Sequence, residues 1–152
     1  MAQVPVPVPD DITAPFWEAA RQGVLKIQRC AGCGAYQQPP GAACYQCASA
    51  DLAFEQVSGR GTVYAYTETR SGARHPAFAA KVPYLVGLVE LAEQPGLLMH
   101  TNFPGATLEM LRTGAGVTVE FERLTDEISI PQFRLATAPD QGVGPALGEG
   151  AT

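Results

Sequence analysis

The chain from residue 58 onward alternates apolar and polar positions in the way that is typical of β-strands. β-Branched and aromatic side chains, which pack well on a pleated sheet, are concentrated in five stretches of this part. The stretches predicted as strands are residues 62–67, 83–91, 96–103, 117–124 and 128–135. The second half of the chain is therefore expected to be mainly β.

A short helix is expected between the third and fourth of these strands. Residues 106–112 place Leu108 and Leu111 on one side, which should face inward. Five strands with a helix at this position follow the element order of an OB-fold, a small and partly open Greek-key barrel. We therefore predict a five-stranded OB-fold barrel over residues 58–137. The glycines expected to allow its sharp bends are Gly59, Gly61, Gly87 and Gly116.

The N-terminal part follows another pattern. Residues 1–12 alternate Val and Pro without a periodic apolar face, which predicts an extended, polyproline-like lead-in. A helix of about two turns follows, with Pro15 in its first turn and Gly23 ending it. It carries Phe16 and Trp17, which it is too short to bury by itself. These rings either pack on their own domain or form a docking element for a partner.

Two CxxC pairs with the overall spacing C-x2-C-x10-C-x2-C follow this helix. In a reducing compartment such pairs bind metals more often than they form disulfides. Four thiolates suit structural zinc, with iron as the minor alternative and disulfides as a further one. A closed four-thiolate shell leaves no position for water, so the metal is expected to contribute folding free energy, about 10 kcal/mol or more in small zinc modules. The ligands are Cys30, Cys33, Cys44 and Cys47.

Strands are expected on both sides of the cysteines, at residues 24–29 and 52–57. Together with the short helix they define a first unit over residues 13–57, a rubredoxin-like zinc ribbon. At the other end, residues 138–152 contain little besides Pro, Gly and Ala, which predicts a disordered tail.

The chain has 152 residues and a net charge of −5, and it has no apolar run long enough for a membrane helix. Its N-terminus lacks the basic start and apolar run of a secretory signal, so a cytoplasmic protein without a membrane partner is expected. The only basic island lies within residues 58–82. It holds four bases against the single acid Glu68. The bases are Arg60, Arg70, Arg74 and Lys81.

Catalytic constellations are not evident in the sequence. Every cysteine is assigned to the metal, and the two histidines, His75 and His100, have no Ser-acid or Cys partner pattern. His75 lies in the basic loop, which is either a solvated loop or, with Arg70, Arg74 and Lys81, a surface that attracts the phosphates of CoA. His100 is expected to be an ordinary sheet residue.

Single-stranded nucleic-acid binding is the alternative that zinc ribbons and OB-folds suggest, with Tyr64, Tyr66 and Tyr84 as stacking candidates. The charge argues against it, because the segment from residue 58 onward sums to −3 and phosphate binding requires many Lys and Arg contacts. No nucleic-acid partner is therefore expected. A rubredoxin-like electron carrier is a further alternative.

Several motifs resemble the family long labelled domain of unknown function thirty-five. Besides the two CxxC pairs, the resemblance rests on the runs Phe16-Trp17, Pro39-Pro40, 59–63, Pro83-Tyr84, 89–91 and 131–133. It covers about residues 13–137 and implies a helical segment, a rubredoxin-like zinc ribbon and an OB-fold.

The resemblance also implies a function linked to acyl-CoA. Members of this family are accessory subunits of thiolase-fold enzymes, including thiolases, acyltransferases and lipid-transfer-protein-like retro-aldolases that shorten steroid side chains. The expectation is a subunit without catalytic residues that docks on a thiolase-like or lipid-transfer-protein-like subunit to form a heterotetramer, and that helps to form the acyl-CoA channel. The residues expected to contact CoA or the partner are Phe16, Trp17, Arg70, Arg74, His75 and Lys81.

Overall fold

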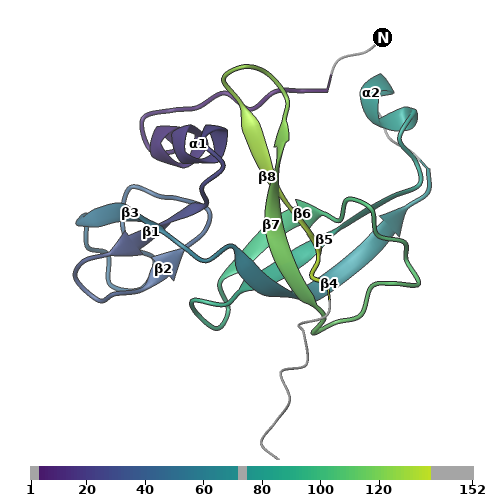
Figure 1. The fold of residues 1–152 in the computed structure, drawn as a ribbon. Helices are drawn as coiled ribbons and strands as arrows, with labels where there is room; N and C mark the ends of the chain where they lie inside the picture. Colours follow the sequence, from purple (N-terminus) through teal and green to yellow (C-terminus); the bar gives the residue numbers. More distant parts are fainter. Residues whose placement is uncertain (1–3, 72–74, 138–152) are drawn as a thin grey trace, which may run out of the picture.

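Eight strands and two short helices make up the described part of the chain, residues 4–71 and 75–137 of a computed structural model (Figure 1). The strands form a three-stranded sheet of order β2-β1-β3 and a five-stranded sheet of order β6-β5-β4-β7-β8. The prediction of a mainly β protein with a short N-terminal helix is confirmed. The predicted tail, residues 138–152, lies outside the described residues, as does Arg74.

Helix α1 (Ala14–Arg21) has Pro15 in its first turn, as the sequence predicts. Thr13 is the N-cap residue but makes no side-chain cap bond. Asp10 instead holds the turn before the helix, because its Oδ1 accepts hydrogen bonds from the backbone N–H groups of Ile12 and Thr13 and from the Thr13 hydroxyl. These bonds lower the pKa of Asp10, with the Thr13 hydroxyl as the largest cause. Residues 10–13 thereby form a hydrogen-bonded turn directly before the helix.

The smaller sheet is the ribbon. It consists of β1 (Lys26–Cys30), β2 (Tyr36–Gln37) and β3 (Leu52–Gln56), with both outer strands antiparallel to β1. The sequence predicts β1 and β3, whereas the two-residue β2 carries too short a pattern to be recognised. Since Cys30 ends β1, the sheet delivers the first ligand to the metal site.

The larger sheet is the OB-fold barrel. Its strands, in chain order, are β4 (Arg60–Thr69), β5 (Tyr84–Leu91), β6 (Leu98–Asn102), β7 (Gly116–Arg123) and β8 (Ser129–Leu135). A bulge between Val63 and Ala65 interrupts the β4–β5 ladder. Across the same ladder, an added Cβ at Gly87 would lie 2.2 Å from the Ala65 carbonyl oxygen, so this close strand approach requires glycine.

Side chains close the barrel between β6 and β8, which share no backbone ladder. The side-chain oxygen of Gln132 accepts a hydrogen bond of 2.8 Å from the backbone N–H of Asn102. The hydroxyl of Thr101 in turn accepts one of 2.9 Å from the backbone N–H of Phe133. Gln132 and Thr101 are buried. These polar groups are therefore paired inside an otherwise apolar wall.

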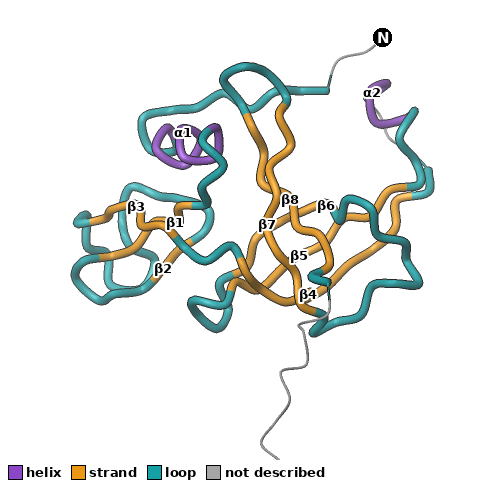
Figure 2. Tube along the Cα trace, in the orientation of Figure 1, coloured by secondary structure: helices purple, strands orange, loops and turns teal. Residues whose placement is uncertain are grey.

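The prediction of a helix at residues 106–112 is wrong. Successive turns occupy the segment, with i to i−3 bonds such as that from the Met110 N–H to the Thr107 carbonyl, and Figure 2 draws it as loop. The Leu111 carbonyl, which a continuing helix would use internally, accepts from the Tyr66 hydroxyl at 3.1 Å. Leu111 is buried as predicted, but Leu108 is 37% exposed. The tertiary contacts of Leu111 thus outweigh the helical periodicity of the segment.

A different helix, α2 (Pro76–Ala79), lies between β4 and β5. Its N-cap is His75, whose Nδ1 accepts from the backbone N–H of Ala77. Figure 1 shows α1 and α2 on opposite sides of the β7–β8 hairpin.

One core joins the ribbon, α1 and the barrel. Phe16 of α1 and Leu25 and Ile27 of the ribbon belong to the same buried cluster as Val89 and Phe133 of the barrel. Within the described residues, the helices are too short to cross a membrane.

Candidate metal centre and the adjoining groove

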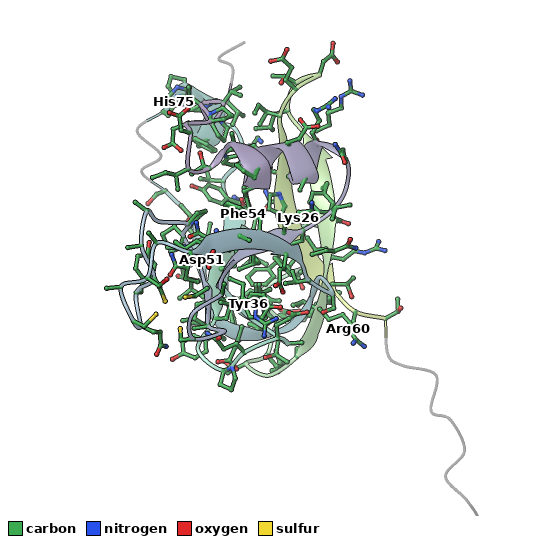
Figure 3. The ribbon with its side chains drawn as sticks, turned by 90° about the vertical axis from the view of Figure 1, so that its left-hand side faces the viewer. Lys26, Tyr36, Asp51, Phe54, Arg60 and His75 are labelled. Atoms are coloured by element: carbon green, nitrogen blue, oxygen red, sulfur yellow. The ribbon has the colours of Figure 1, made fainter. Side chains whose placement is uncertain are left out.

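The four cysteines converge on one point, as the spacing predicts. Their sulfur atoms all lie within 4.8 Å of one another. Cys30 and Cys44 are buried, whereas Cys33 and Cys47 are exposed. In Figure 3 sulfur atoms gather near Asp51, at the end of the ribbon away from His75. The two CxxC pairs, ten residues apart in the sequence, therefore meet at one place.

Both knuckles use the same backbone turn. The N–H of Gly34 donates to the Cys30 carbonyl at 2.8 Å, and the N–H of Ala48 donates to the Cys44 carbonyl at 2.9 Å. The residue after each second cysteine is left-handed, with φ of 78° at Gly34 and 60° at Ala48. Ala48 is the only described non-glycine residue with positive φ. The second knuckle therefore holds an alanine where glycine fits best.

The backbone favours thiolates at the two buried cysteines. A hydrogen bond from the backbone of Cys33 is the main cause that lowers the pKa of Cys30 to about 6. Backbone bonds from Cys47 and Gln46 likewise lower the pKa of Cys44. At Cys47 the Ser49 backbone acts in the same direction, but the facing thiols of Cys30 and Cys33 outweigh it and raise the pKa to about 12.

The sulfur geometry fits a tetrahedral metal. Zinc–sulfur bonds of about 2.3 Å separate the ligand sulfurs by about 3.8 Å in a tetrahedron. The Cys30–Cys47 and Cys33–Cys44 sulfur distances are both 3.6 Å. Disulfide sulfurs are about 2.05 Å apart, so the disulfide alternative is wrong for this geometry. Four thiolates fill the shell and support a structural metal, because no position is left for a reacting water.

Phe16 and Trp17, predicted as partner contacts, pack edge to face with ring centroids 5.0 Å apart. Phe16 is buried in the core, and Trp17 is partly buried. Both line a groove of about 1020 Å³, which we call the central groove. Its other walls are the Gln38–Pro39 loop of the ribbon and parts of β4, β5, β6 and β8. The two aromatic residues thus serve their own core and also face an open surface.

Among the described residues of the predicted basic loop, Arg70, His75 and Lys81 do not line this groove. Arg70 pairs with Glu68, and His75 caps α2. Lys81 lines a second hollow, of about 440 Å³, together with Phe78 and Tyr84. Phe78 and Tyr84 do not line the central groove. The predicted contact residues therefore occupy two places.

Sequence reasoning missed the groove's strand residues. His100 lies on β6, exposed, and lines the central groove beside Leu98. Gln132 and Asn102 line both hollows and form the polar wall between them. Glutamine is mostly exposed in proteins, so the burial of Gln132 could not be read from the sequence. Nothing in the strand pattern says which outward residues face a groove.

A four-thiolate ribbon fused through one core to a small OB-fold barrel defines a class of two-part, metal-stabilised β proteins. Two family descriptions match consecutive parts of the chain: "ChsH2, rubredoxin-like zinc ribbon domain" over residues 17–53 and "ChsH2, C-terminal OB-fold domain" over residues 54–122. The chain belongs to this ChsH2 family, also called DUF35, as the sequence resemblance implies.

Solved structures agree with this assignment. A chain of the "Ltp2-ChsH2(DUF35) aldolase" is 37% identical with a TM-score of 0.76, and the match covers 86% of this chain and 99% of that one. A DUF35 protein of unknown function from Sulfolobus solfataricus is 13% identical with a TM-score of 0.57, over 83% and 86% of the two chains, and shares the fold.

Two curated relatives are longer. The "probable enoyl-CoA hydratase alpha subunit" of Thermomonospora curvata is 38% identical over 83% of this chain and 38% of its own length. The "3-oxo-4,17-pregnadiene-20-carboxyl-CoA hydratase alpha subunit" of Mycobacterium tuberculosis is 30% identical over 90% of this chain and 45% of its own length. The chain thus spans less than half of these relatives.

Proposed function

We propose that this chain is a non-catalytic subunit of a thiolase-fold enzyme that acts on acyl-CoA, by retro-aldol or thiolytic C–C cleavage or by acyl transfer. The similarity to a chain of the Ltp2-ChsH2(DUF35) aldolase carries the proposal, because it extends over 99% of that chain. Steroid side chains are the favoured substrate class, since one relative is named for a pregnadiene carboxyl-CoA. Aromatic acids are the alternative.

The chemistry of the chain supports a subunit without its own reacting groups. All four cysteines belong to the metal cluster, so no thiol is left as a nucleophile. His75 caps a helix through Nδ1, and His100 lies on another element. The reacting groups are therefore assigned to the partner, and this chain supplies a docking surface and one side of the acyl-CoA channel.

Zinc is the proposed metal, and its role is structural. The sulfur separations suit zinc or a single iron equally, because both ions accept four thiolates in a tetrahedron. Elemental analysis of the purified protein separates them. One zinc per chain and a colourless solution are expected, whereas a red protein with iron would favour the electron-carrier alternative.

For CoA contact we propose the surface that carries Arg70, Arg74, His75 and Lys81. Lys81 forms no ion pair among the described residues, and it lies beside the aromatic hollow. Lys81→Gln should raise the KM of the complex for acyl-CoA severalfold with little change in kcat, because a phosphate contact is lost. Arg134→Gln on β8 is the control and should leave KM unchanged. Equal KM values for Lys81→Gln and Arg134→Gln would show that Lys81 does not contact CoA.

Coexpression tests the function itself. The chain and the thiolase-fold subunit encoded beside it should co-purify in a fixed ratio, for which a heterotetramer is the expected mass. The catalytic subunit alone should be inactive or insoluble. Separate elution of two active proteins at micromolar concentration would reject the proposal.

A further inference from the structure

We infer that the central groove is the docking site for an uncharged, apolar segment of the catalytic partner, with Trp17 as its anchor. This inference rests on the proposed function and assigns the surface that the function requires. The CoA-contact surface around Lys81 is a separate place, so the two assignments can fail independently.

The first observation is the composition of the outward barrel face. Three outward positions on β5 and β6, Val86, Leu88 and Leu98, are apolar and only partly buried, and their ladder partners are Asn102, His100 and Glu90. On β7 of the same barrel the outward positions Thr118 and Glu122 are polar. A barrel face in contact with water usually carries polar side chains, as β7 does. The part of the β5–β6 face that lines the central groove therefore leaves apolar side chains open to a partner.

The second observation is charge. None of the described residues lining the central groove is Asp, Glu, Lys or Arg, although the chain has 10 Lys and Arg residues and 15 Asp and Glu residues. Buried centres of protein interfaces are depleted in charged residues and enriched in aromatic ones. An uncharged groove matches an uncharged occupant, because a charged segment would lose its hydration without gaining a partner.

The third observation is an unpaired polar atom in the wall. The side-chain oxygen of Gln38 is buried and has no hydrogen-bond partner among the described residues. Gln38 lines the groove beside Pro39. Buried polar atoms are nearly always paired, and this oxygen is closed off from solvent, so the Gln38 side chain would turn outward to meet an N–H or O–H donor of an occupant. A polypeptide segment offers such donors along an apolar surface.

The groove is also preformed. Its ribbon wall is held to the barrel by Gln94, whose side-chain amide makes hydrogen bonds of 2.9 and 3.1 Å to the backbone N–H and carbonyl of Tyr36. Its helix wall is held by Phe16, which is buried in the common core. A surface that is rigid before binding loses less entropy on association. This favours a stable subunit contact.

A second copy of the chain fits the groove less well. The most exposed apolar side chains, such as Val8, Tyr45 and Met110, lie on three different segments and form no apolar element of their own. A partner segment is therefore the occupant that we assign.

The test measures the affinity of the thiolase-fold subunit for purified variants of this chain. His100→Glu places a charge in the groove at an exposed position that should not disturb folding. We expect its Kd to rise at least tenfold, and Trp17→Ala should raise Kd further, because buried tryptophans dominate interface energetics. Met110→Glu, exposed but outside the groove, is the matched control and should stay within twofold of wild type.

Metal content and melting temperature confirm that each variant is folded. An unchanged Kd in His100→Glu would overturn the groove assignment while the proposed function stands. Absence of binding by the wild-type chain would instead reject the function. If the wild-type chain alone is a dimer and His100→Glu makes it a monomer, the groove binds a second copy and the inference is wrong.

Discussion

Ala48 shows at the residue scale how the metal site constrains its own sequence. Its φ of 60° costs an L-residue about 1–2 kcal/mol of stability. Glycine at the same position avoids this strain, but it lowers stability by about 0.4–1 kcal/mol because it gives the unfolded chain more conformational entropy. Ala48→Gly should therefore stabilise the metal-loaded protein by about 0.5–1 kcal/mol. Guanidinium unfolding measures the change.

Ala31 provides the matched control for this prediction. It lies inside the first CxxC pair and is absent from the residues with positive φ. Ala31→Gly should lower stability by about 0.4–1 kcal/mol, since only the unfolded-chain entropy changes. If both substitutions destabilise equally, the left-handed turn at Ala48 carries no strain.

Cys44 is the residue that tests the ligand set. A serine hydroxyl is a poor zinc ligand at neutral pH, so Cys44→Ser should reduce the bound metal well below one ion per chain and weaken binding to the catalytic subunit. Metal analysis and a pull-down with that subunit measure both effects. Ala43→Ser introduces the same hydroxyl at the neighbouring position and should change neither the metal content nor the binding. Full metal content and unchanged co-purification in Cys44→Ser would contradict the structural role.

At the element scale, the turn between β5 and β6 is hydrogen-bonded to the ribbon. Gln94 imitates a neighbouring strand for β2, because its amide pairs with both backbone groups of Tyr36. Gln94→Leu leaves those two groups without partners and should cost about 1–3 kcal/mol. Urea unfolding and faster hydrogen exchange at the Tyr36 amide should report the loss.

Gln56 on β3 is the comparison for that substitution. Its side chain is exposed and makes no hydrogen bond among the described residues. Gln56→Leu should change stability by less than about 0.5 kcal/mol. Protection of the Tyr36 amide that is the same in wild type and Gln94→Leu would show that the turn does not hold the ribbon.

At the scale of the whole molecule, the shared core couples the metal to the barrel. Leu25 and Ile27 of the ribbon pack in the same cluster as Val89 and Phe133 of the barrel. Removing the metal with a chelator should therefore lower the melting temperature of the entire molecule, and it should still melt in one transition. Trp17 fluorescence and far-ultraviolet circular dichroism should change together.

Two separated transitions after chelation would contradict this coupling. They would mean that the barrel keeps its fold while the ribbon melts alone. Re-addition of zinc to the chelated protein is the control, and it should restore the original melting temperature.

The sequence by itself determined what depends on local periodicity and ligand spacing. The two CxxC pairs predict the cluster of Cys30, Cys33, Cys44 and Cys47, since four soft ligands at this spacing have few other stable arrangements. The alternation of β4 to β8 likewise predicts five strands, because one face of each must be buried. These features require no knowledge of distant contacts.

Only the tertiary structure decided what depends on residues far apart in the chain. The segment 106–112 becomes turns because the Leu111 carbonyl pairs with the distant Tyr66 hydroxyl. His100 faces a groove because α1 and the Gln38–Pro39 loop of the ribbon line the same hollow as β6, and Gln132 is buried because it bridges to Asn102. Such contacts join positions about 30 or more residues apart, and their free energy exceeds the weak local preferences that a sequence pattern records.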